Sequence, residues 1–173
     1  MTKTIKMTQE EYDRFQQNIK AFGRYQDEEK NVMAHEAGHM LLLRKFFPNN
    51  TYTYGVNEKG NPCVNNPYKD YDFEKPTVSK QLLMVSLAGL VAYCKYIGIS
   101  NRETQLIMDY LVDGKNRDDD GDLWKYQGFS QLCAEFFGVK WKIRKLVSDT
   151  YDALDIDAIQ AEVEYQKSMK KVA

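Results

Sequence analysis

Apolar residues recur at helical spacing along most of the chain, which predicts a mainly helical fold. Thr8 and Glu11 form a capping box ahead of the first such pattern, so a first helix is expected over residues 8–22. The next pattern continues until Pro48, a residue that cannot extend a helix. It predicts one long helix over residues 27–47.

Later segments repeat this behaviour. The run LLMVSLAGLVAY is almost wholly apolar, which predicts a helix over residues 77–97 that is buried around most of its circumference and stops at Gly98. Ser100 and Glu103 form another capping box and open a helix that is expected to end near Gly114. Further helical patterns cover residues 120–137, 140–153 and 156–171.

One stretch departs from helical spacing. Residues 49–76 are rich in Asn, Gly, Pro and Tyr, and the β-prone run TYTYGV precedes the turn signal KGNP at residues 59–62. A small, irregular β hairpin is expected there. The predicted fold class is therefore mainly α, or α+β with a minor β hairpin or edge element. Because no linker or internal repeat divides the series, residues 1–173 are expected to form a single domain.

Composition narrows the classes of function. The 173 residues, 43% of them hydrophobic, suit one domain with its own core. With 24 Lys+Arg against 25 Asp+Glu, the chain lacks the basic excess that nucleic-acid binding needs. It has neither a bilayer-length apolar run nor a signal-peptide stretch, so a cytoplasmic protein without membrane contact is expected. Cys63, Cys94 and Cys133 are widely separated, which argues against a disulfide framework.

The only two histidines lie four residues apart. The segment NVMAHEAGHMLLL contains His35, Glu36 and His39 as an H-E-x-x-H motif. On a helix both imidazoles share one face and can bind a single Zn²⁺, while Glu36 can act as general base on a zinc-activated water. The small residues Ala37 and Gly38 are expected to leave room beside the metal. This pattern predicts a zinc-dependent metallopeptidase that hydrolyses polypeptides or peptides.

A catalytic zinc ion needs a third protein ligand and an open position. Because the chain has no further histidine, this ligand must be Asp, Glu or a single Cys. Aspartates concentrate between residues 113 and 122. The candidates are Asp113, Asp118, Asp119, Asp120 and Asp122. Each of them also suits a solvated loop or a helix N-cap, so spacing does not choose among them.

The segment AHEAGHMLLL resembles the zinc helix of the FtsH-type ATP-dependent zinc metalloproteases. Two later stretches resemble that family in the same order, LAGLVAYCKYIG at residues 87–98 and GDLWKYQGFSQLCAEFFGV at residues 121–139. The resemblance implies a zincin-like metallopeptidase core over residues 27–139, followed by C-terminal helices over residues 140–173. It also implies that Asp122 is the third zinc ligand, because the aspartate of the family's N-D-L segment has that role.

The chain also departs from that family. Its 173 residues contain no nucleotide-binding P-loop, AAA+ module or membrane anchor. The resemblance therefore implies a stand-alone peptidase that ATP does not drive in cis, with a separate ATPase or self-association left open. The family's arginine and paired glutamates after L-A-G are replaced by Leu90, Tyr93 and Cys94. The alternative is a non-enzymatic zinc-binding or protein-interaction domain derived from the same fold.

Overall fold

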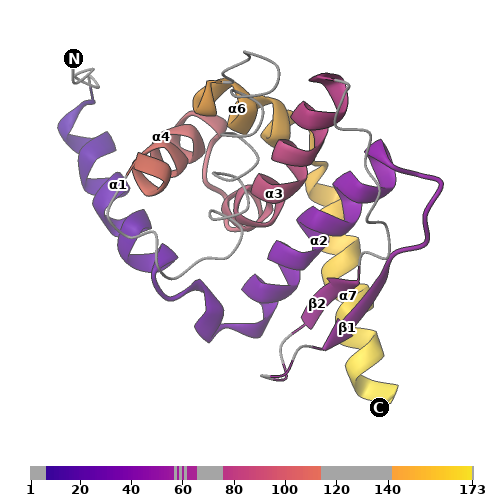
Figure 1. The fold of residues 1–173 in the computed structure, drawn as a ribbon. Helices are drawn as coiled ribbons and strands as arrows, with labels where there is room; N and C mark the ends of the chain where they lie inside the picture. Colours follow the sequence, from indigo (N-terminus) through magenta and orange to yellow (C-terminus); the bar gives the residue numbers. More distant parts are fainter. Residues whose placement is uncertain are drawn as a thin grey trace.

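The computed structural model describes residues 7–56, 58, 60, 62–65, 76–113 and 142–172 (Figure 1). The elements in chain order are α1 (Gln9–Phe22), a 3-10 helix (Tyr25–Asp27), α2 (Glu29–Phe46), β1 (Thr53–Val56), β2 (Pro62–Asn65), α3 (Pro76–Tyr96), α4 (Asn101–Asp113), α6 (Ile143–Ala153) and α7 (Ile156–Val172). The predicted fold class, mainly α with a minor antiparallel β element, is confirmed. The helix expected over residues 120–137 lies outside the described residues.

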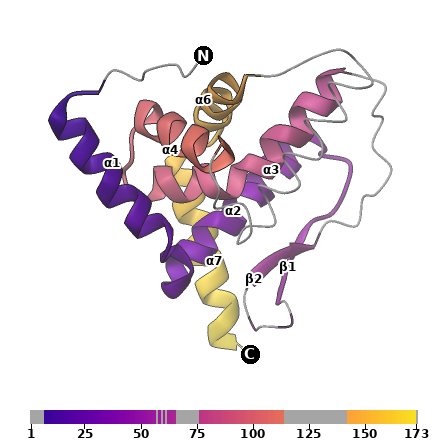
Figure 2. The same cartoon turned by 60° about the vertical axis from the view of Figure 1, so that its left-hand side comes forward.

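Helices α2 and α3 pack against each other at the centre, and α7 and the β hairpin lie along α2 (Figures 1 and 2). By length and composition, the segment Thr77–Tyr96 of α3 could cross a membrane, but 72% of its most apolar window is buried inside the protein. Core packing therefore explains its apolar character. Leu90, Tyr93 and Cys94, which stand where the resembling family has charged residues, are all buried in this core.

Gly38 allows α2 to approach α3 closely. A Cβ atom at this position would lie 2.2 Å from the carbonyl oxygen of Ala88 and 2.6 Å from the Cβ of Ala92. No side chain larger than hydrogen fits between the two backbones. The expectation that Gly38 leaves room beside a metal is therefore corrected, because its small size serves the packing of α2 on α3.

Local signals mark the start of α1 and the end of α3. The hydroxyl of Thr8 accepts a hydrogen bond from the N–H of Glu11 at 3.1 Å, and the Glu11 carboxylate accepts one from the N–H of Thr8 at 2.9 Å. This is the predicted capping box. At the end of α3, Gly98 takes a φ of 86° and the N–H of Ile99 reaches back to the carbonyl of Cys94 at 2.9 Å. Gly98 therefore stops α3, as predicted.

The long helix predicted over residues 27–47 is shorter than expected. Glu28 is extended, with φ −110° and ψ 120°, so the chain makes a separate 3-10 turn before α2 begins at Glu29. The break turns Tyr25 into the core, where its ring packs against Phe22 and Tyr93. The break before α2 thus coincides with the burial of an aromatic side chain in the preceding turn.

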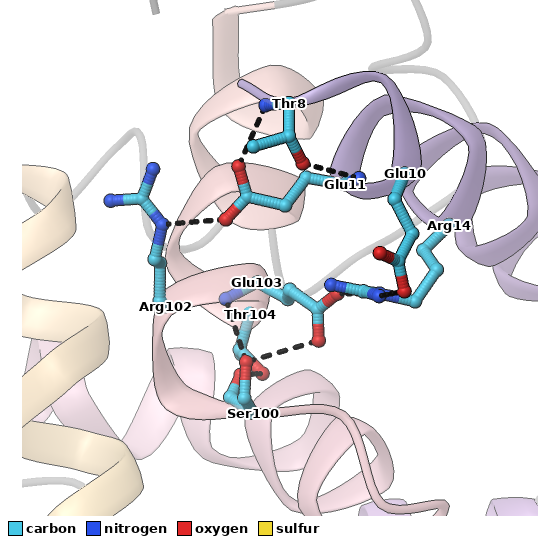
Figure 3. A network of polar contacts seen from close by, with 8 residues as sticks. All are labelled: Thr8, Glu10, Glu11, Arg14, Ser100, Arg102, Glu103 and Thr104. Atoms are coloured by element: carbon cyan, nitrogen blue, oxygen red, sulfur yellow. Dashed lines mark hydrogen bonds and ion pairs between the residues drawn. The ribbon is translucent and has the colours of Figure 1, made fainter. Parts of the chain in front are cut away.

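Two helix N-termini hold α1 against α4 (Figure 3). The Glu11 carboxylate of the first capping box accepts from the Nε of Arg102 at 3.3 Å. The Glu103 carboxylate of the second accepts from the Nε of Arg14 at 2.7 Å, while the hydroxyl of Ser100 caps α4 by accepting from the N–H of Glu103 at 3.2 Å. Each capping glutamate thus pairs with an arginine of the other helix.

Glu103 makes the stability of this junction depend on pH. The hydrogen bond from Arg14 holds the pKa of its carboxyl below the ordinary value of 4.5. A carboxyl of this kind stabilises the fold fully above its unfolded pKa, and the contribution is lost as pH falls through the folded pKa. Below about pH 4.5, the free energy of unfolding should therefore fall more steeply in wild type than in Glu103→Gln, by on the order of 1 kcal/mol or less because solvent screens the pair. Parallel curves in urea titrations at several pH values would contradict this expectation.

Candidate metal centre

His35 and His39 face each other across one turn of α2. Their Nε2 atoms are 3.1 Å apart, and the two rings meet edge to face at an interplanar angle of 72°. Two imidazole nitrogens on one tetrahedral zinc ion, each at about 2.0–2.1 Å from the metal, are separated by about 3.3 Å. The observed spacing is close to that value. A single metal ion can therefore accept both nitrogens with little rearrangement.

The tautomer of His39 is determined by α3. The Nδ1 of His39 lies 2.8 Å from the backbone carbonyl oxygen of Val85. Because a carbonyl can only accept a hydrogen bond, Nδ1 carries the proton, and in the neutral ring the Nε2 then presents its lone pair toward His35. In metal sites, the second ring nitrogen of a ligating histidine typically donates to such an acceptor, which orients the ring.

His35 occupies a slot between α3 and the turn that precedes α2. Its side chain is only 7% exposed, and its ring stacks on Tyr25 with an interplanar angle of 12°. On the α3 side, a Cβ atom at Gly89 would lie 2.4 Å from the Nε2 of His35 and 2.6 Å from its Cδ2. The absence of a side chain at Gly89 therefore creates the space in which the imidazole lies.

Glu36 extends beside the histidine pair. Its Oε1 lies 3.9 Å from the Nε2 of His35, and its Oε2 accepts a hydrogen bond from the backbone N–H of Val64 in β2 at 3.0 Å. One ligand atom from each of His35, Glu36 and His39 lies within 4.8 Å of the others. The structure thus brings together all three residues of the H-E-x-x-H motif. Two imidazole nitrogens with an adjacent carboxylate suit a divalent transition metal such as zinc.

Other candidates from the sequence are placed differently. Asp122, together with the aspartates at 118–120, lies outside the described residues. Cys94 is fully buried, and burial raises the pKa of its thiol to about 12, which leaves it protonated and a poor metal ligand at neutral pH.

The sequence did not predict three features of the site. They are the hydrogen bond at the carbonyl of Val85, the hydrogen bond from the N–H of Val64 and the space at Gly89. Backbone groups leave no mark in a sequence, so nothing pointed to Val85 or Val64. Gly89 did carry a signal, because it belongs to the L-A-G stretch that resembles the metalloprotease family. Its use as the space for an imidazole becomes apparent only when α2 and α3 are packed together.

Family models, curated proteins and solved structures were each compared with the chain, and none of them matches it. The resemblance to the FtsH-type metalloproteases therefore remains a prediction that rests on the motifs alone.

Gly89→Ala should damage the centre specifically. The new methyl group would overlap the ring of His35, so we expect zinc affinity to fall at least about 10-fold and the fold to lose about 1–3 kcal/mol of stability through overpacking. Gly23→Ala is the control, because a Cβ there meets its nearest atom at 3.6 Å, an ordinary contact. Isothermal titration with zinc and urea denaturation measure the two effects. Equal zinc affinity in the two variants would contradict the claim that the His35 ring needs the space at Gly89.

Proposed function

We propose that the protein is a zinc-dependent metallopeptidase in which His35 and His39 bind the metal and Glu36 is the general base. The observation that carries the proposal is the pair of Nε2 atoms 3.1 Å apart with the Glu36 carboxylate beside them. A purely structural site needs ligands but no general base. The position of Glu36 therefore favours hydrolysis over a structural role.

The chemistry divides between the metal and the chain. Zinc, when bound, supplies Lewis acidity that makes a water molecule more acidic and polarises the scissile carbonyl. Glu36 accepts the proton of the attacking water on its Oε1, the oxygen that faces the histidines, and delivers it to the leaving amine nitrogen. His39 keeps its Nε2 available because Val85 holds the proton on Nδ1. The substrate class that follows is a polypeptide or peptide.

The remaining parts of the proposal come from the resemblance to the FtsH-type metalloproteases. It supplies Asp122 as the third zinc ligand and a zincin-like core over residues 27–139. A separate ATPase or self-association as a partner belongs to the same proposal, and the lack of a signal-peptide stretch adds a cytoplasmic location to it.

A second candidate is a non-enzymatic zinc-binding or protein-interaction domain. The burial of His35, whose exposed fraction is 6%, favours it, because structural zinc sites are closed to solvent. The two candidates differ in what zinc removal does. A structural site loses stability only, whereas a peptidase also loses a chemical activity that returns when zinc is added.

The experiment is hydrolysis of an unfolded polypeptide by the purified protein before and after chelation. We expect one zinc ion per chain, loss of hydrolysis to background on treatment with a chelator, and recovery on addition of one equivalent of zinc. Circular dichroism on the same samples reports whether the chain stays folded. Zinc binding without any hydrolysis would favour the non-enzymatic candidate and contradict the peptidase.

A further inference from the structure

A backbone group of the β hairpin contacts the candidate site. The N–H of Val64 donates to the Oε2 of Glu36 at 3.0 Å, across 28 residues of sequence. A backbone donor to a carboxylate forms a charge-assisted hydrogen bond, which is stronger and more directional than a neutral one. It leaves Oε1 facing His35, whose Nε2 lies 3.9 Å away. The hairpin thus determines which oxygen of Glu36 turns toward the histidines.

The register of the hairpin explains why Val64 is the donor. In the antiparallel pair, Val64 lies opposite Tyr54 and Pro62 lies opposite Val56. Successive N–H groups along a strand point to opposite edges, and because the N–H of Val64 donates to Glu36 of α2, we place it on the edge of β2 that faces away from β1. Pro62 occupies the same edge two residues earlier and has no N–H. Val64 is therefore the one residue of β2 that can donate on that edge.

The hairpin itself is fastened to two helices. Its Tyr54 and Val64 pack against a small cluster formed by Met40, Leu43 and Tyr52, which joins the hairpin to α2. The strand β2 faces the same helix that carries Glu36. Val64 is thus held against α2 by apolar packing as well as by its hydrogen bond.

A polar contact fastens the other strand. The hydroxyl of Tyr54 donates to the Oε2 of Glu162 in α7 at 2.6 Å, and Arg44 of α2 pairs with the Oε1 of the same carboxylate at 2.5 Å. Burial, then the hydrogen bond to Glu162, raises the pKa of the Tyr54 hydroxyl, which therefore stays protonated and donates. Contacts with α2 and α7 fix the position of β1. Its partner strand β2 is therefore also fixed, with the N–H of Val64 at hydrogen-bond distance from Glu36.

We propose that Val64 is a positioning residue for the general base: its backbone N–H holds one oxygen of Glu36 so that the other faces the histidine pair. This inference rests on the proposed peptidase function. A glutamate side chain has several rotatable bonds, and without this donor it would sample rotamers that turn the carboxylate away from the reacting atoms. Displacement of a catalytic group by about 1 Å costs on the order of 100-fold in rate.

Two substitutions of Val64 distinguish the role of its N–H from that of its side chain. Val64→Pro removes the N–H and leaves the ladder to β1 intact, because that N–H is not part of it. Val64→Ala keeps the N–H and removes most of the side chain. We expect kcat to fall about 10- to 100-fold in Val64→Pro, with KM and zinc content within about three-fold of wild type. Val64→Ala loses apolar packing on α2 but keeps the donor, so its kcat should fall several-fold less than that of Val64→Pro. A folded Val64→Pro protein with wild-type kcat would overturn the proposal.

Hydrogen exchange followed by NMR tests the contact without any activity, and it decides the question if Val64→Pro fails to fold. We expect exchange of the Val64 amide to accelerate about 10-fold or more in Glu36→Ala, while the amide of Cys63, on the opposite edge of β2, changes little. Unchanged exchange at Val64 would overturn the proposal. If the Val64 amide exchanges faster in Glu36→Ala, but the wild-type protein binds zinc and hydrolyses no peptide, the proposed function is contradicted instead.

Discussion

Replacing Glu36 by glutamine is expected to lower kcat for peptide hydrolysis by about 10²–10⁴-fold, the usual contribution of a general base. Glutamine has the same length, and its amide oxygen can still accept the hydrogen bond from the N–H of Val64. The side chain therefore keeps its place but can no longer take a proton from water. Hydrolysis of an unfolded polypeptide, measured with zinc content on the same samples, gives the result.

Zinc content should stay at one ion per chain in Glu36→Gln, because neither imidazole is altered. Glu29→Gln is the matched control, since Glu29 is an exposed glutamate at the start of the same helix. Its kcat should match wild type. If Glu36→Gln retained hydrolysis within about three-fold of wild type, Glu36 would not be the general base.

Replacing His39 by alanine is expected to lower zinc affinity by more than about 100-fold. Removing a hydrogen-bond partner of a metal ligand typically lowers metal affinity about 10- to 100-fold, and removing the ligand itself should lower it further. His39 suits this experiment better than His35, because His39 is only partly buried whereas His35 packs against Tyr25 and Gly89. Loss of zinc from His39→Ala therefore reports on coordination, with less contribution from a damaged core. Competition titration with a zinc chelator dye measures the change.

Lys45→Ala provides the control for His39→Ala. Lys45 is exposed and lies on the same helix, so its removal should leave zinc affinity within about two-fold and alter stability by less than about 0.5 kcal/mol. Urea denaturation of the metal-free proteins separates unfolding from loss of a ligand. Equal zinc affinity in His39→Ala and Lys45→Ala would remove His39 from the ligand set.

The histidine pair was predictable because a helix converts sequence spacing directly into position. Residues four apart lie one above the other whatever surrounds the helix, so His35 and His39 had to meet once α2 formed. Capping boxes are equally local, and those at Thr8 and Ser100 formed where the sequence indicated. The hairpin followed from the turn that contains Gly60, whose φ is 80°.

Tertiary packing decided what the sequence left open. The separate turn before α2 places Tyr25 in the core, an outcome that depends on Phe22 and Tyr93 from other segments. The same holds for Gly38, since its neighbours Ala88 and Ala92 belong to α3. A helical pattern records which faces are apolar but not which residue of another helix they meet.

Extended X-ray absorption at the zinc edge, on protein loaded with one equivalent of zinc, tests the metal site most directly. The geometry of His35 and His39 predicts two imidazole nitrogens at about 2.0–2.1 Å from the metal in wild type and one in His39→Ala. A zinc ion without imidazole scattering in the wild-type spectrum would contradict the assignment of these two histidines as its ligands.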